Sequence, residues 1–236
     1  MGIGRNLAML EKILPREVAV VETFSDDPAA TLFPGERAVI AKAVAKRRTE
    51  FATARACARA ALARLGEPPA PILRGPRGAP QWPAGVTGSI THCDGYRAAA
   101  VARTSETHAL GLDAEPNETL PEGVAETIAL TQEREQIADL AATQPDVCWD
   151  RLLFCAKESV YKAWFPLTQR WLDFKSAHVT ISPQNGTFRA LLLVPGPVVD
   201  GVQLSVMHGR WLAARGLLVT AIVIPACPVA GYAQPA

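Results

Sequence analysis

The segment that most restricts the fold is residues 146–165, whose apolar side chains recur with the period of an α-helix. At about 100° per residue, one side of this helix is apolar and needs a core to pack against. That side consists of Leu152, Leu153, Ala156, Val160, Ala163 and Trp164. The opposite arc consists of Phe154, Lys157, Glu158, Tyr161, Lys162 and Phe165. A solvated face would rarely carry three aromatic rings, so this arc is expected to form the wall of a site.

A second pattern lies in the apolar run LGLDAEP, residues 110–116, which is typical of a strand. Successive side chains of a strand point to opposite faces of the sheet. Gly111, Asp113 and Glu115 therefore share the face opposite to the leucines. The sequence predicts two carboxylates side by side on one face, with a glycine in front of them.

The remaining patterns predict an α+β protein. Residues 17–23 are expected to form a strand, residues 34–65 one helix or two joined near Thr49, and residues 86–91 and 96–102 a hairpin. An acidic helix is expected at 121–142, and strands follow Pro166, with Asn185 and Gly186 as a hairpin turn. This order predicts two similar α+β units, at residues 1–107 and 108–224, and a flexible tail at residues 225–236.

Composition narrows the classes of protein. The chain has 236 residues and a formal net charge of +1, which gives no overall attraction to nucleic acid or membranes. No apolar run reaches the roughly 20 residues of a membrane span, and the N-terminus lacks a secretory signal. A cytoplasmic location is therefore expected. Five cysteines without a CxxC pair argue against a disulfide framework and a zinc site.

Carboxylates from the two patterned segments form one candidate metal set. Asp113, Glu115 and Glu158 offer hard oxygen ligands of the kind that Mg²⁺ prefers together with substrate phosphates. Basic side chains that could hold such phosphates are Arg48, Arg55, Arg74, Arg77 and His92. Spacing leaves other interpretations open. The acids could lie on a solvated strand face, Glu158 and Lys162 could form only an i,i+4 ion pair, and the basic residues could be surface charges.

Three segments resemble motifs of the 4'-phosphopantetheinyl transferases. They are RGAPQWPAGVTGSITHCDGYRAAAVA, LGLDAEP and FCAKESVYKAWFP, and the stretch AKRRTEFATARACARAALARLG is similar to the arginine-bearing helix of that family. The resemblance runs from residue 13 to residue 224. It is closest to the longer Sfp/EntD-like class, and within it to the actinobacterial PptT-like members. Two departures are Phe154, where many members have Trp, and the absence of Gly-Lys-Gly after Lys162.

The resemblance implies two pseudo-symmetric halves, each a small, mainly antiparallel sheet packed with a long helix, and coenzyme A in a cleft between them. It implies that Mg²⁺, with Mn²⁺ as an alternative ion, is bound by Asp113, Glu115 and Glu158. It implies that the phosphates and adenosine of coenzyme A are held by Arg48, Arg55, Arg74, Arg77, Ser89, Thr91 and His92. Lys157 and Lys162 are implied to lie near the diphosphate.

The implied reaction transfers 4'-phosphopantetheine from coenzyme A to a serine of an apo acyl or peptidyl carrier protein and releases 3',5'-adenosine bisphosphate. Glu158 is the expected base, and Lys162 is expected to stabilise the departing phosphate. The carrier protein is expected to dock near Phe165 and Trp171 on a monomeric enzyme, with no nucleic-acid or membrane partner. Two rival interpretations are another Mg²⁺-dependent diphosphate hydrolase and a non-catalytic module that binds coenzyme A.

Overall fold

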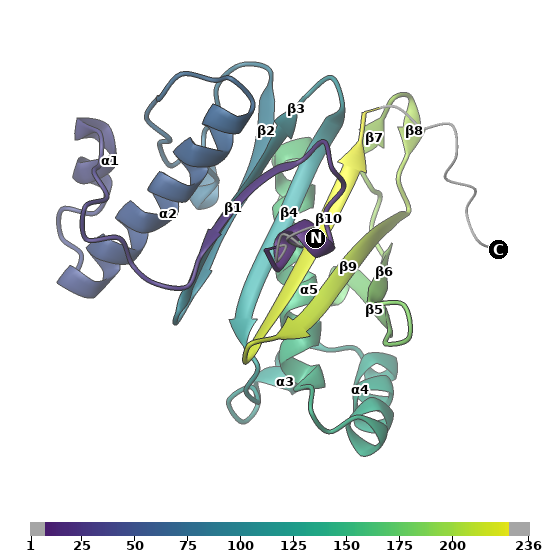
Figure 1. Cartoon of the computed structure of the whole chain (residues 1–236). Coiled ribbons are helices and arrows are strands. Elements are labelled where there is room, and N and C mark those ends of the chain that lie inside the picture. The colour runs from purple at the N-terminus through teal and green to yellow at the C-terminus, as the bar shows by residue number, and fades with distance from the viewer. Residues whose placement is uncertain (1–7, 227–236) are drawn as a thin grey trace, which may run out of the picture.

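The computed structural model describes residues 8–226 and is shown in Figure 1. The helices are α1 (Pro34–Val39), α2 (Ala45–Arg64), α3 (Val124–Ile128), α4 (Thr131–Thr143) and α5 (Trp149–Thr168). The strands are β1 (Ala19–Thr23), β2 (Val86–Cys93), β3 (Tyr96–Arg103), β4 (Thr107–Pro116), β5 (Ala177–Ser182), β6 (Thr187–Leu192), β7 (Val198–Val199), β8 (Val202–Gln203), β9 (Val206–Ala214) and β10 (Leu217–Pro225). Among residues 8–226, no helix combines the length and apolar character needed to cross a membrane.

The strands form two main sheets and a small hairpin. One sheet has the order β1-β3-β2, the other has the order β4-β10-β9-β6-β5, and β7 pairs with β8. Every pairing between these strands is antiparallel. The expectation of an α+β fold with antiparallel sheets is confirmed.

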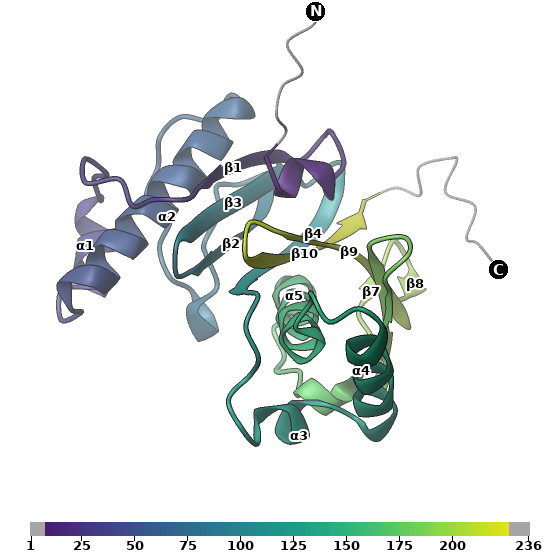
Figure 2. The same ribbon diagram turned by 60° about the horizontal axis from the view of Figure 1, so that its bottom comes forward.

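A long helix packs on each main sheet. In Figures 1 and 2, α2 covers the three-stranded sheet and α5 covers β4 and β10 of the five-stranded sheet, with α4 beside α5. Each helix has a core beneath it, in which Leu62 contacts the smaller sheet and Trp164 the larger one. A third core includes Leu10, Tyr96, Leu112 and Val219, and so joins strands of both sheets.

The two sheets meet along β2 and β4, which lie side by side without a regular ladder between them. Across this seam, the backbone N–H of Leu112 donates to Ser89 Oγ over 3.0 Å, and both residues are buried. A buried amide needs a partner, and here a side chain supplies what a neighbouring strand would otherwise give. The seam brings β2 of one half against β4 of the other.

The two halves repeat one local device. Glu36 in α1 accepts a hydrogen bond from the N–H of Phe33 and forms an ion pair with Arg59 of α2 at 3.1 Å. Glu133 in α4 accepts from the N–H of Leu130 and forms an ion pair with Lys157 of α5 at 2.8 Å. Each carboxylate also accepts from a distant backbone N–H, that of Ile72 and that of Val179 respectively. Both acids are buried, so each ties a short helix to the long helix of its half.

Several expected boundaries differ in the structure. The helical region near residues 34–65 breaks at residues 40–44, before Thr49, because the chain is extended at Val44. The expected helix at 121–142 is divided into α3 and α4 by an extended Ala129. Residues 225 and 226, which were expected to belong to a tail, are part of the fold, since Pro225 ends β10 and the N–H of Ala226 donates to Glu106 O. Residues 227–236, including Cys227, lie outside the described residues.

Candidate active site at the seam of the two halves

Gly111 explains how helix α5 approaches strand β4. A Cβ atom at this position would lie 2.0 Å from the backbone oxygen of Ser159 and 2.8 Å from the backbone nitrogen of Ala163. Only glycine leaves room for a helix backbone this close to a strand. The close crossing places the face of β4 that carries Asp113 against the second half of α5.

Asp113 is the centre of the polar cluster at this crossing. It is 5% exposed, and its Oδ1 accepts hydrogen bonds from Lys162 Nζ at 2.7 Å and from Thr91 Oγ1 at 3.4 Å. Burial opposes the charge on Lys162, but the Asp113 carboxylate outweighs it, so the pKa of Lys162 is raised above the ordinary lysine value. Asp113, Thr91 and Lys162 thus meet from three elements, β4, β2 and α5.

Glu158 lies half-buried on α5, one turn before Lys162. Burial and the charge of Asp113 raise the pKa of Glu158, against the opposing effect of Lys162. A carboxylate with a raised pKa is suited to exchange a proton nearer to neutral pH. Its surroundings therefore agree with those of a general base.

Glu115 has a different environment from Asp113, although the two acids share a face of β4. Its Oε2 forms an ion pair with Arg151 Nη1 at 3.1 Å, and Arg151 also donates to the backbone oxygens of Glu118 and Thr119. Burial and Asp113 raise the pKa of Glu115, while Arg151 lowers it. Arg151 therefore binds the carboxylate of Glu115, one of the three expected metal ligands.

Asp113, Glu115 and Glu158 together offer oxygen ligands of the kind that a divalent cation binds. Within residues 8–226, no three His, Cys, Asp or Glu side chains converge into a preformed metal-binding group. Two observations nevertheless fit a hard cation. Asp113 Oδ2 is buried and has no hydrogen-bond partner among the described residues, and the charge of Asp113 raises the pKa of both Glu115 and Glu158. A bound cation would give the buried oxygen of Asp113 a partner and would offset the repulsion between the carboxylates. Asp113 and Glu158 are the two carboxylates free to bind it.

His92 lies at the end of β2 and contacts an arginine that the sequence analysis did not select. Arg47 Nη1 lies 2.7 Å from His92 Nε2, whereas Arg48 is exposed on the neighbouring helix position. Burial, followed by the charges of Arg47 and Lys162, lowers the pKa of His92 to about 4. His92 is therefore neutral and accepts from Arg47. The sequence could not show which of the two adjacent arginines contacts His92, because that contact depends on where β2 meets α2.

Arg55, one of the expected phosphate-binding arginines, also has partners inside the protein. Arg55 is buried, donates from Nε to Ile72 O at 2.9 Å and stacks over the ring of Phe51. Burial lowers the pKa of Arg55 to about 10, with Glu36 opposing this and Arg74 adding to it. Ser89, placed at the seam by its bond to Leu112, likewise has a structural role. Arg74 itself is exposed.

Arg77 links the two halves over the site. Its guanidinium lies 5.1 Å from the ring centroid of Trp171, and its backbone has a positive φ of 53°. Trp171 stacks in turn on Tyr161 of α5, with ring centroids 5.0 Å apart. Burial raises the pKa of Tyr161, while the charge of Arg77 lowers it and that of Glu158 raises it. Arg77 and Glu158 thus both act on the same phenol.

Lys157 was expected to lie near the diphosphate of coenzyme A, and the structure gives it other partners. Its ammonium forms an ion pair with Glu133 and donates to the backbone oxygens of Phe174 at 2.7 Å and Ala177 at 2.8 Å. An ammonium has three N–H donors, and these contacts use all of them. The charge of Lys157 is therefore committed to the fold and is not available to a diphosphate. The sequence could not reveal this, since the three partners lie on α4, just before β5 and at the first residue of β5.

A pocket of about 210 Å³ opens beside Glu158, between α5 and the segment that precedes β5. Its walls are formed mainly by Val160, Tyr161, Trp171, Leu172 and Phe174. The alkyl stem of Lys157 also lines it. The cluster around Asp113 thus has a largely apolar pocket beside one of its acids, which suits a ligand with a charged part and a less polar arm.

Comparison with known proteins gives a family for this geometry. The model of the 4'-phosphopantetheinyl transferase N-terminal domain matches residues 35–102, and the model of the 4'-phosphopantetheinyl transferase superfamily matches residues 109–199. The chain belongs to the 4'-phosphopantetheinyl transferases. The superfamily match contains Asp113, Glu115, Glu158 and Lys162, and the N-terminal match contains Arg47 and His92.

Three curated members of the 4'-phosphopantetheinyl transferases are similar over nearly the whole chain. Svp of Streptomyces mobaraensis is 57% identical over 221 residues, which cover 92% of this chain and 90% of that protein. Npt of Nocardia iowensis is 52% identical over 222 residues, which cover 91% of this chain and 99% of that protein. PptT of Mycobacterium tuberculosis is 48% identical over 230 residues, which cover 95% of this chain and 100% of that protein. The resemblance to this family and to its actinobacterial members is confirmed.

Proposed function

We propose that this protein transfers the 4'-phosphopantetheine group of coenzyme A to a serine of an apo carrier protein and releases 3',5'-adenosine bisphosphate. Membership of the family supports the reaction class. The observation that carries the proposal is the cluster of Asp113, Lys162 and Glu158 at the seam, with a buried carboxylate oxygen left unpartnered. Such a cluster offers a metal-binding acid, a cation and a base side by side.

We propose Mg²⁺ as the metal ion, with Asp113 and Glu158 as ligands and Glu115 as a third acid that must leave Arg151 in order to bind. Mn²⁺ is an alternative with similar ligand preferences. When bound, the ion supplies neutralisation of charge that develops on the diphosphate oxygens. The hard oxygen set and the raised pKa of Glu115 and Glu158 support this assignment.

Glu158 is proposed to accept the proton of the attacking serine. Its raised pKa brings it closer to the pH at which a base works best, and general-base help is typically worth about 10²- to 10⁴-fold. Lys162 is proposed to stabilise the departing phosphate. Its raised pKa keeps it charged at neutral pH, so it can donate to an oxygen that gains negative charge.

The donor is proposed to lie across the seam. Arg47 and His92, which contact each other, are proposed to hold phosphate at one end. Arg48, Arg55, Arg74 and Arg77 are proposed to lie around it, with Thr91 and Ser89 beneath. The pocket beside Glu158 is proposed to take the pantetheine arm, since its walls are largely apolar and one of the acids stands at its side. This places the bond to be broken near Lys162.

The carrier protein is proposed to dock beside the pocket, where Trp171 is 55% exposed while Phe165 is buried. Trp171 therefore remains a docking candidate, and Phe165 belongs to the core. We also propose a monomeric protein of the cytoplasm. The cysteines of residues 8–226 are free, which agrees with a reducing compartment.

The test is intact mass spectrometry of purified apo carrier proteins incubated with coenzyme A, Mg²⁺ and this protein. We expect each carrier to gain one phosphopantetheine, and the gain to be lost when the metal is chelated. Asp113→Asn serves as the matched inactive variant. Consumption of coenzyme A without a carrier would instead identify a hydrolase, and binding of coenzyme A without either reaction would identify a non-catalytic module.

A further inference from the structure

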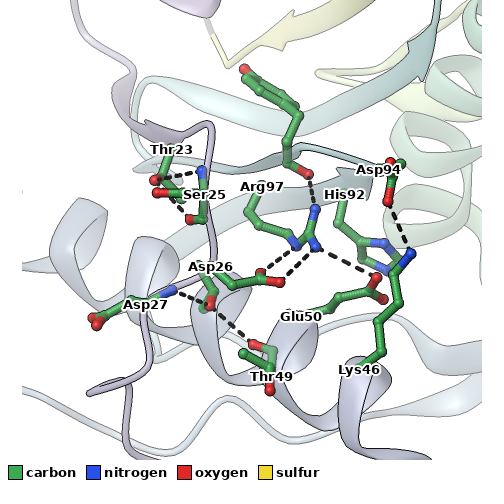
Figure 3. A network of polar contacts seen from close by, with 12 residues as sticks. Thr23, Ser25, Asp26, Asp27, Lys46, Thr49, Glu50, His92, Asp94 and Arg97 are labelled. Atoms are coloured by element: carbon green, nitrogen blue, oxygen red, sulfur yellow. Dashed lines mark hydrogen bonds and ion pairs between the residues drawn. The ribbon is translucent and has the colours of Figure 1, made fainter.

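Arg97 is a buried charge that the proposed reaction does not use. It lies on β3, is 4% exposed and sits at the centre of the polar network in Figure 3. Its Nη1 donates to the backbone oxygens of Cys93 and Tyr96, the latter over 2.9 Å. Its Nε and Nη2 lie 3.0 and 3.2 Å from the two carboxylate oxygens of Asp26. The guanidinium therefore joins the β2–β3 turn to the loop that follows β1.

The same guanidinium reaches the first turns of α2. Arg97 Nη2 lies 3.5 Å from Glu50 Oε1, and the other oxygen of Glu50 lies 3.4 Å from Arg47 Nη1. Arg47 in turn contacts His92 at 2.7 Å. A continuous path of polar contacts thus runs from the buried Arg97 through Glu50 and Arg47 to His92. Figure 3 shows its first contact, between Arg97 and Glu50.

We propose that Arg97 is a positioning residue for donor binding: by holding Glu50, it fixes Arg47 against His92 before coenzyme A arrives. The proposal rests on the proposed function, because it concerns the same donor. Arg47 has a partly exposed, flexible side chain, and fixing it on binding would cost conformational entropy. A partner that fixes it beforehand lowers this cost and so strengthens binding.

Arginine is suited to this position because its planar fork makes several fixed contacts at once. Lysine would keep the positive charge but could not hold Asp26, Glu50 and two backbone oxygens together. Replacing Arg97 by Lys therefore separates orientation from charge. A general electrostatic effect on an anionic donor stays nearly constant in this variant.

The main test is steady-state transfer by the full chain with Arg97→Lys. We expect the KM for coenzyme A to rise about tenfold while kcat at saturating coenzyme A stays within about twofold. Asp26→Asn touches neither Glu50 nor Arg47, and it should raise the same KM by about threefold through a loosened Arg97. An unchanged KM for coenzyme A in both variants overturns the proposal.

Arg103→Lys is the matched control. Arg103 lies at the other end of β3 and forms an ion pair with Glu67, far along the strand from His92. We expect it to lower thermal stability without changing the KM for coenzyme A. If Arg103→Lys and Arg97→Lys change stability and KM alike, Arg97 has only a structural role and the proposal is wrong.

A second readout does not depend on transfer. The charged groups around His92 are Arg47, Lys162, Glu50 and Arg97 itself, and lysine at position 97 keeps its charge. We expect NMR titration to show a higher pKa for His92 in Arg97→Lys than in the wild type, because Arg47 moves away. If the wild type transfers nothing, the proposed function fails, and this titration still decides whether Arg97 positions Arg47. An unchanged His92 titration overturns that positioning.

Discussion

The two acids of β4 have different surroundings, although they lie two residues apart. Asp113 contacts Lys162 and Thr91, and its second oxygen has no partner within residues 8–226, whereas Glu115 is held by Arg151. Alternation along a strand predicts that both side chains point to the same face of the sheet. It does not predict which residues of other elements each side chain contacts. At this scale, the acids should therefore differ in their effect on the reaction.

Asp113→Asn and Glu158→Gln should each reduce carrier modification at least about 100-fold, since each removes a charged ligand or the base. Glu115→Gln should cost less, about tenfold, because Glu115 is shared with Arg151. Mass spectrometry of the carrier measures the product, and circular dichroism checks that each variant is folded. Near-normal transfer by folded Asp113→Asn would falsify the metal site.

Lys162→Ala should lower turnover more than it weakens coenzyme A binding. Lys162 Nζ lies 2.7 Å from Asp113, and its charge is proposed to matter most when the phosphate departs. Rapid-quench kinetics and calorimetric titration with coenzyme A separate the two effects. A variant with normal kcat and only weaker binding would contradict the leaving-group role.

At the scale of elements, the contact between α4 and α5 is a buried ion pair. Glu133 and Lys157 are both almost fully buried, and the carboxylate also accepts from the backbone N–H of Val179. Burial lowers the pKa of Lys157, and Glu133 opposes that effect. The pair therefore fixes the wall of the pocket beside Glu158.

Lys157→Ala should lower the free energy of unfolding by about 3–5 kcal/mol, because it leaves the Glu133 charge buried without a partner. Lys175→Ala, at an exposed position nearby, is the control and should change stability by less than about 0.5 kcal/mol. Urea unfolding measures both. If Lys157→Ala keeps the stability of the wild type and only weakens coenzyme A binding, the residue contacts the diphosphate after all.

The crossing of β4 and α5 depends on Gly111 in the same direct way. Gly111→Ala would place a Cβ atom 2.0 Å from Ser159 O, and backbone atoms cannot move aside cheaply. We expect a loss of at least about 4 kcal/mol or no folded protein. Gly85→Ala is the control: it has a positive φ but open space, and should cost only about 1 kcal/mol. If Gly111→Ala and Gly85→Ala lower the thermal stability equally, contact with α5 is not the reason why position 111 requires glycine.

At the scale of the whole molecule, the sequence predicted those features that depend on periodicity within a single helix or strand. The faces of β4 and α5, the hairpin of β2 and β3, and the antiparallel strands after α5 follow from patterns within each segment. Contacts between distant segments could not be predicted in this way. The contact of His92 with Arg47, the ion pair of Glu115 with Arg151 and the burial of Lys157 all depend on how elements meet.

The seam between the sheets also belongs to this scale. Ser89→Ala would leave the buried N–H of Leu112 without its partner and should cost about 1–3 kcal/mol. Both halves share a core across the seam, so we expect one unfolding transition at a lower temperature. Calorimetry measures this. Two separate transitions in the variant would show that the halves fold independently.

The stack of Arg77 on Trp171 gives the protein an intrinsic optical reporter. Among its five tryptophans, Trp171 is 55% exposed, Trp82 is partly buried, and Trp149, Trp164 and Trp211 are at most 9% exposed. Quenching of fluorescence by iodide will therefore act chiefly on Trp171, whose ring faces a cation from the opposite half. Emission from this indole can follow ligands entering between the halves without any attached dye.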